Sequence, residues 1–192
     1  MKRTASLVLS LVLALSLASC APSEPTPTPP PDPNPVVTPE ATPAPVEGSF
    51  TLTYYPEGEE TTIATAQFLG EGYTLHVPTQ DWGTVLDTGD GYEAVTLHST
   101  VNEEVCLRVY TLSGLDRLDA VQDFLKDAYP GFALIEDNRG GLGGEHEDGR
   151  LLDSRIFLTE EGAYALVLLY PLEAAEGFGM LLNAMADTFT LT

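Results

Sequence analysis

The sequence is poor in positive charge. Lysine and arginine together number 8 against 29 aspartates and glutamates, which gives a formal net charge of −21. A field of this sign repels phosphate backbones, so we expect no nucleic-acid partner. The same charge favours solubility at a crowded surface. No motif in the sequence indicates a cofactor, and we expect none.

Cysteine and long apolar runs are also scarce. The two cysteines are Cys20 and Cys106, and if Cys20 is consumed by processing, Cys106 has no disulfide partner. A lone cysteine in an apolar strand pattern usually behaves as a small buried hydrophobe. The strongest run in the body of the chain, 163–170, is far shorter than the roughly 20 apolar residues of a spanning helix. We therefore predict a strand there.

The N-terminus has the features of an export signal. Lys2 and Arg3 precede an apolar run over 7–17, and Leu17-Ala18-Ser19-Cys20 follows it. These four residues resemble the lipobox of bacterial lipoproteins. The resemblance implies cleavage after a signal peptide over 1–19 and a diacylglyceryl group on Cys20. Two acyl chains anchor a protein stably, so we expect it on the extracytoplasmic face of the cell membrane. The alternative is an ordinary secretory signal followed by an accidental cysteine.

Proline and threonine dominate the residues after Cys20. This segment, 20–47 with Cys20 included, has too few large apolar side chains to form a core, so we predict a disordered, proline-rich stalk. Proline favours an extended conformation of about 3.1 Å per residue, which gives a reach of roughly 80 Å. The remaining residues, 48–192, form the single domain that we predict.

Turn signals divide this domain into short alternating segments. They predict strands over 49–55, 61–69, 73–77, 92–99, 104–112, 132–137, 150–159 and 162–170. Helical spacing predicts helices over 116–129, with Asp116 as N-cap, and over 172–187. Trp82 is expected in a loop against the core, and the glycines of 140–144 in a loose segment. Tight turns imply antiparallel pairing. The prediction is an α+β domain, a mainly antiparallel sheet with two helices packed against it, preceded by a β-hairpin.

Part of this pattern is similar to that of PsbP-like domains. The resemblance rests on 72–78 leading to Trp82, the helix near 118–128, and the ending 164–171 followed by a helix and Asp187-Thr188-Phe189. It covers about residues 72–190 and omits the hairpin over 50–69. It implies a PsbP-like sandwich and a binding or accessory role rather than an enzyme.

One loop concentrates polar ligands. Glu145, His146, Glu147 and Asp148 bring three carboxylates and an imidazole together after flexible glycines. Carboxylate oxygens suit Ca²⁺, although the spacing is not that of an EF-hand. The alternative is a solvated turn.

No catalytic residue is assigned from the sequence. His76 and His98 lie in predicted strands, but no serine or cysteine has the context of an activated nucleophile. The glycines of 140–144 are followed by Glu145 rather than by the Lys-Ser/Thr of a phosphate-binding loop.

An aromatic groove is a further candidate. Asp81 and Trp82, near Tyr73 and Tyr92, are suitable for binding a sugar or a peptide, with core packing as the alternative.

The sequence thus supports three hypotheses. The first is a monomeric lipoprotein with a non-catalytic binding or accessory role, whose partners are the membrane and another envelope protein. The second is a cell-wall hydrolase with two carboxylates about 5–10 Å apart. The third is a calcium-responsive binding module.

Overall fold

The computed structural model describes residues 46–192, and their side chains from residue 50 onward. The signal peptide over 1–19, Cys20 and nearly all of the stalk lie outside the described residues. The described residues belong to one compact unit. Its first strand begins at Val46, two residues before the predicted start of the domain. Within this part, no helix is long and apolar enough to cross a membrane.

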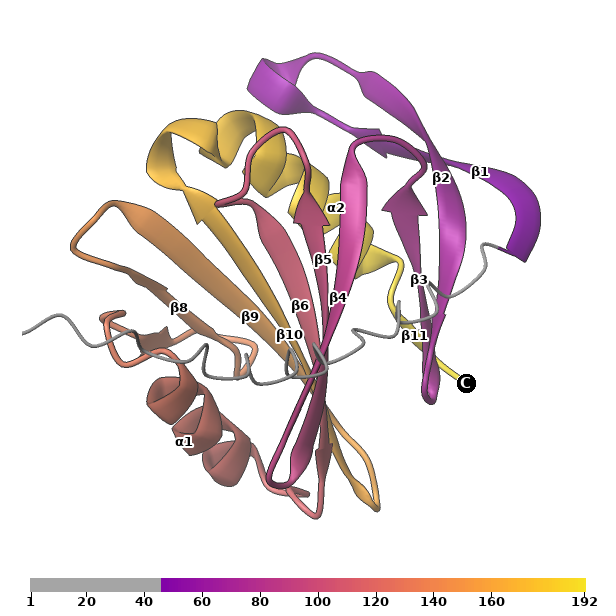
Figure 1. Ribbon diagram of the computed structural model, residues 1–192. Helices are drawn as coiled ribbons and strands as arrows, with labels where there is room; N and C mark the ends of the chain where they lie inside the picture. The colour runs from indigo at the N-terminus through magenta and orange to yellow at the C-terminus, as the bar shows by residue number, and fades with distance from the viewer. Residues whose placement is uncertain (1–45) are drawn as a thin grey trace, which may run out of the picture. The chain divides into compact units, whose positions relative to one another are not determined.

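The strands form two antiparallel sheets (Figure 1). The four-stranded sheet has the order β1 (Val46–Tyr54), β2 (Thr61–Gly70), β3 (Tyr73–Pro78), β11 (Thr190–Leu191). The seven-stranded sheet has the order β4 (Trp82–Gly89), β5 (Tyr92–Ser99), β6 (Cys106–Ser113), β10 (Gly162–Pro171), β9 (Arg150–Leu158), β8 (Leu142–Glu145), β7 (Ile135–Glu136). The predicted α+β class is confirmed, but the predicted hairpin is half of a second sheet.

Two helices complete the fold. α1 (Leu118–Ala128) begins after Arg117, and no side chain caps it, so the expected cap at Asp116 is wrong. The final helical segment passes through three geometries, namely the 3₁₀ turn η2 (Leu172–Ala174), the π turn η3 (Ala175–Gly179) and the α-helix α2 (Met180–Asp187). The glycines of η3 have low helix propensity, which explains why the predicted continuous helix is interrupted.

The seven-stranded sheet carries a core on each face. α1 covers one face, while α2 and the four-stranded sheet lie on the other (Figure 1). The central strand β10 serves both cores, since Ala165 and Val167 point to the α1 side and Leu166 and Leu168 to the α2 side. β10 is therefore covered on both faces, and the strand predicted over 163–170 is confirmed.

Three segments differ from expectation. Trp82 begins a strand, β4, rather than lying in a loop. The predicted strand over 132–137 is reduced to the two residues of β7 and a single bridge between Phe132 and His146. In the segment expected to be loose, Gly143 and Gly144 belong to β8. Gly141 and Gly144 lie so close to neighbouring backbone that a Cβ at either position would clash.

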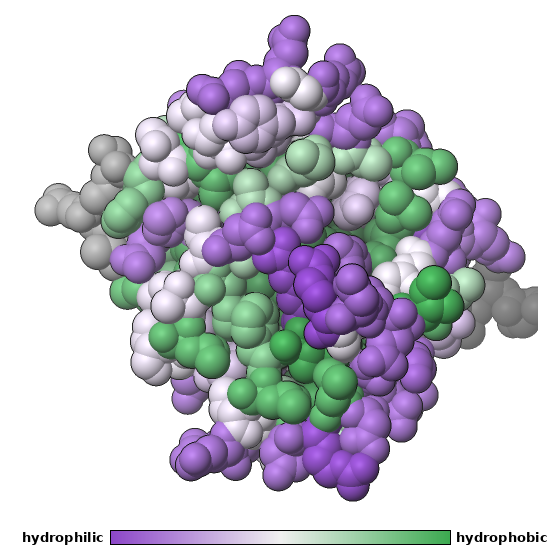
Figure 2. Space-filling view, turned by 180° about the vertical axis from the view of Figure 1, so that it is seen from behind, coloured by the Kyte–Doolittle hydropathy of each residue, from purple (hydrophilic) through white to green (hydrophobic). Residues whose placement is uncertain are grey.

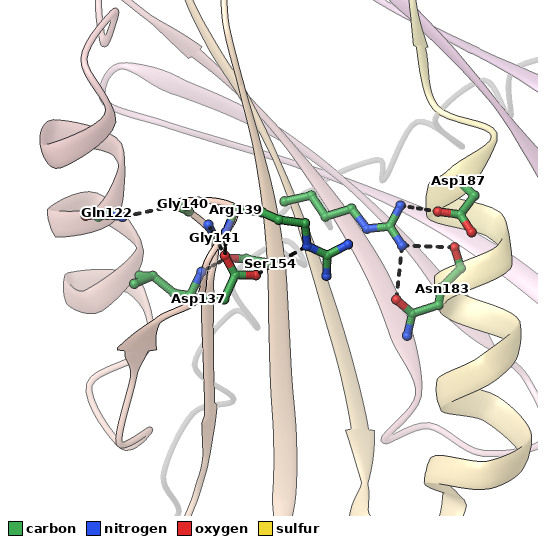
Figure 3. Close-up of polar contacts among 10 residues, drawn as sticks. Gln122, Asp137, Arg139, Gly140, Gly141, Ser154, Asn183 and Asp187 are labelled. Atoms are coloured by element: carbon green, nitrogen blue, oxygen red, sulfur yellow. Dashed lines mark hydrogen bonds and ion pairs between the residues drawn. The ribbon is translucent and has the colours of Figure 1, made fainter.

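Side-chain hydrogen bonds connect α1 to the β7–β9 edge (Figure 3). The amide of Gln122 donates to the Gly140 carbonyl at 3.0 Å. The Asp137 carboxylate accepts the backbone N–H groups of Arg139 and Gly141 at 2.7 and 2.9 Å. These bonds fix the loop before β8, so the sheet edge is well defined despite its glycines.

A second connection joins β9 to α2 (Figure 3). The Arg155 guanidinium donates to Asp187 Oδ1 at 2.6 Å and to Asn183 Oδ1 at 3.0 Å. On the opposite face of β9, the buried Ser154 hydroxyl accepts the Leu142 N–H at 2.7 Å. β9 therefore anchors α2 on one side and β8 on the other.

Candidate functional site

An open cleft of about 400 Å³ lies between the hairpin β1–β2, the β3–β4 connection, the β5–β6 loop and the start of α2. Its volume falls within the range of ligand pockets, about 300–1,000 Å³. Aromatic rings from three separate elements line it: Tyr54, Trp82 and Phe178. Ligand-binding clefts commonly combine such rings with a few polar groups.

Backbone hydrogen bonds hold the walls of the cleft. The Thr100 N–H donates to the Asp81 carbonyl at 2.8 Å, which joins the β3–β4 connection to the β5–β6 loop. The Ser99 hydroxyl, fully buried, accepts the N–H groups of Val101 and Asn102 at 3.3 Å. The cleft is therefore shaped before any ligand arrives, which lowers the entropy cost of binding.

Two unusual backbone conformations border the cleft. Asp81 has φ of 62°, in the left-handed region that side chains other than glycine rarely adopt. Phe178 lies in the π turn η3, and π turns are frequent at functional sites. Strained backbone costs about 1–3 kcal/mol and persists where the surroundings or the function require it. Both conformations place a cleft-lining side chain.

The lining has one charged group and no cation. Asp81 supplies a carboxylate, while Thr79, Gln80 and Ser99 supply neutral hydrogen-bonding groups. Without a lysine or arginine in the lining, and with a strongly acidic chain around it, the cleft repels anions. Its chemistry suits a neutral or cationic ligand with a flat apolar face.

The structure only partly assembles the aromatic groove expected from the sequence. Asp81 and Trp82 line the same cleft. Tyr73, however, is buried against Phe189, with ring centroids 5.2 Å apart, and Tyr92 packs in the α1 core. Tyr54 and Phe178 take their places, and their distance from Trp82 along the chain explains why sequence reasoning missed them.

The surface offers no broader apolar site on the face shown in Figure 2. There, apolar side chains form several patches that a central hydrophilic group separates. Scattered apolar patches of this kind are normal for soluble domains.

In the acidic loop over 145–148, the side-chain contacts stabilise the turn itself. Asp148 Oδ1 lies 2.6 Å from His146 Nδ1, and Asp148 Oδ2 accepts from Arg150 Nε at 2.9 Å. The Arg150 guanidinium lowers the pKa of the Asp148 carboxyl well below its ordinary value. Glu145 and Glu147 are exposed. Among residues 50–192, no group of three or more His, Cys, Asp or Glu side chains is arranged to hold a metal ion.

The two strand histidines lie apart from the cleft lining. The His76 ring stacks on Phe50 with centroids 4.4 Å apart. The His98 ring lies over Gly83, where it occupies the space that a Cβ would need. In the part of the chain that the structure describes, the nearest partners of these two rings are Phe50 and Gly83 rather than a carboxylate that could orient a catalytic base.

The free cysteine has the character expected of a buried thiol. Burial raises the pKa of Cys106 to about 11, against the opposing effect of Arg108 and Arg150. The thiolate is the reactive form, so we expect the half-buried Cys106 thiol to react slowly at neutral pH.

Carboxylates are abundant but not paired in the cleft. Asp81 is the only carboxylate among the lining residues. Asp153, whose pKa is raised by burial, lies on β9 and outside the cleft. A glycoside hydrolase needs two carboxyls flanking its substrate. The geometry therefore favours binding over hydrolysis at this cleft.

Comparison with known proteins finds similar solved structures but no similar sequence family. No protein-family model matches the chain, and no curated protein matches it. The solution structure of cyanobacterial PsbP (CyanoP) from Synechocystis sp. PCC 6803 is similar at 13% identity and a TM-score of 0.49, covering 67% of this chain and 92% of that one. A crystal structure from Bacteroides thetaiotaomicron VPI-5482 is similar at 16% identity and a TM-score of 0.38, and the match covers 66% of this chain and 48% of that one. The α+β class rests on the two sheets and two helices themselves.

Proposed function

We propose that this protein is a lipid-anchored, extracytoplasmic lipoprotein whose domain binds a component of the cell envelope without chemically changing it. The observation that carries the proposal is the pre-shaped aromatic cleft with a single carboxylate. Aromatic faces and neutral hydrogen-bonding groups are suited to the apolar face and the hydroxyls of a neutral saccharide. We therefore take an uncharged envelope glycan as its ligand.

The anchoring half of the proposal is supported by the sequence. The signal and the lipobox ending at Cys20 provide for export and for two acyl chains. The proline-rich segment after it is long enough to carry the domain roughly 80 Å from the lipid surface when extended. A binding domain on such a stalk reaches ligands that a domain held at the membrane does not.

Glycan binding is tested through the single tryptophan. Because Trp82 is the only tryptophan and lines the cleft, a ligand that binds there should change its emission. Soluble, uncharged cell-wall glycan fragments are titrated into the full chain in detergent. We expect a saturable change in emission with the fragments recovered intact.

Two variants localise the binding by calorimetry. Phe178→Ala removes one stacking face and is expected to weaken binding by about tenfold or more, a loss of roughly 1.5 kcal/mol. The control, Phe124→Leu, changes a ring in the α1 core and leaves affinity unchanged. Cleavage of the fragments, or saturable binding that is indifferent to Phe178, would contradict the proposal.

A further inference from the structure

β4 is an outer strand with an unusually long, regular free edge. All of its residues pair with β5 in unbroken register, from Trp82 opposite Ser99 to Gly89 opposite Tyr92. The other outer strands of the described residues are poorer templates, since β7 and β11 have two residues each and β1 has a register shift. β4 is therefore the edge best formed for pairing with another strand.

The hairpin register shows which backbone groups of β4 point outward. Gly89 and Tyr92 close a two-residue turn, so they exchange both hydrogen bonds. Hydrogen-bonded pairs alternate along an antiparallel ladder, which turns the N–H and C=O groups of Thr84, Leu86 and Thr88 away from β5. In the described part of the chain, nothing else hydrogen-bonds these groups. They form a row of unpaired donors and acceptors.

β4 carries few of the features that usually protect such an edge. Proteins discourage edge pairing with lysine, proline, bulges or covering elements. β4 has no lysine or proline, its ladder has no bulge, and Val85 and Leu86 are 52% and 38% exposed. Its single charged side chain, Asp87, is engaged by Arg108 at 2.6 Å.

A depression of about 640 Å³ lies beside this edge. Val85 and Asp87 from β4 line it together with His98 from β5 and Arg108 from β6. Val85 pairs with Thr96, and Gly83 pairs with His98, so these side chains share one face of the sheet. A strand added to β4 would direct every second side chain toward this depression.

We propose that the β4 edge binds an extended, cationic segment of a partner protein, which extends the seven-stranded sheet by one strand. Backbone hydrogen bonds to β4 supply affinity, and the depression receives alternate side chains. The charge of the partner follows from the charge of this chain, since residues 48–192 hold 25 of the 29 acidic residues and 6 of the 8 basic ones, a formal charge of −19. That charge disfavours a second copy and attracts a basic segment. This surface adjoins the glycan cleft, since Ser99 lines both and Trp82 of the cleft begins β4, but strand pairing along β4 does not require a bound glycan.

The test uses the full chain in detergent and a capped peptide of alternating threonine and valine with a lysine at each end. We expect the peptide to bind saturably by calorimetry and to protect the amides of Thr84, Leu86 and Thr88 from hydrogen exchange. The same peptide with alternate backbone nitrogens methylated should bind at least tenfold more weakly. A version with a glutamate at each end should bind more weakly than the lysine peptide by a similar factor, and this difference should shrink at high salt.

Two variants at one position separate backbone pairing from side-chain contact. Leu86→Pro removes an outward N–H, which edge strands tolerate, and is expected to reduce peptide affinity at least tenfold. Leu86→Ala keeps that N–H and is expected to stay within about threefold of the parent. Trp82 emission is used to check that each variant is folded. If Leu86→Pro does not fold, the N-methylated peptide alone tests whether backbone pairing provides the affinity.

Equal binding of the methylated peptide would overturn the proposal. So would a chain that sediments as a dimer and is made monomeric by Leu86→Pro, because the edge would then be occupied by a second copy.

Discussion

Replacing Leu182 with alanine tests whether α2 joins the two sheets into one folding unit. Leu182 is fully buried in the core cluster that contains Leu75 of β3 and Leu168 of β10. Leucine-to-alanine changes in cores cost about 2–5 kcal/mol, depending on how far the site can collapse. Since both sheets and α2 itself line this site, collapse is limited. We expect a loss of about 3–5 kcal/mol, or about 10–15 °C in Tm.

The assay is urea unfolding of the full chain followed by two probes. Trp82 emission reports the junction between the sheets, and far-ultraviolet circular dichroism reports the strands and helices of the whole domain. The matched control is Leu158→Ala, because Leu158 is 46% exposed and should change stability by less than about 0.5 kcal/mol. A loss below about 1 kcal/mol for Leu182→Ala, or two probes with separate midpoints, would refute the reasoning.

Three further predictions concern the cleft and two titrating groups. Ser99→Ala leaves two loop N–H groups without their acceptor and should cost about 1–3 kcal/mol, measured by urea unfolding, with a glycan affinity that falls as well. Arg150→Gln should raise the pKa of Asp148 toward its ordinary value, as measured in a carbon-detected NMR titration. In the parent protein, the stability that this lowered pKa contributes is present above the unfolded-state pKa of about 3.9. It is lost as the pH falls through the folded-state pKa. Cys106, with a folded pKa of about 11, should resist thiol reagents at pH 8 in a Cys20→Ser chain and react at once in urea. Rapid labelling of the folded chain would contradict the burial of that thiol.

The strands that face a core were predictable from the sequence. The strands predicted over 150–159 and 162–170 are β9 and β10, which pair as a hairpin, and the apolar Leu107 and Val109 share one face of β6. These segments are visible because burial forces apolar residues into a period of two. β4 was missed because its outer half packs against no core, so no such pattern is imposed on it.

The division into two sheets was not predictable by the same reasoning. Alternation tells which residues are buried but not which strands are neighbours, and the C-terminal β11 returns to pair with β3 over a long sequence separation. Leu191 lies at this short edge and is 42% exposed, whereas Phe189, two residues earlier, is buried.

Only part of the cleft could be predicted from the sequence. The sequence predicts Asp81 and Trp82 as part of an aromatic groove, and both line the cleft. Tyr54 and Phe178 reach the cleft from distant parts of the chain, so only the fold brings them there. The loop over 145–148 has the composition of a cation site, but Asp148 pairs with Arg150, which lies just beyond the loop.

The proposed role depends most directly on where the mature chain begins and what its first residue carries. Mass spectrometry of the protein isolated from its native membranes measures both. The account predicts an N-terminal peptide that starts at Cys20 with a diacylglyceryl group on its sulfur. An intact Met1, or a mature chain whose Cys20 bears a free thiol, would contradict it.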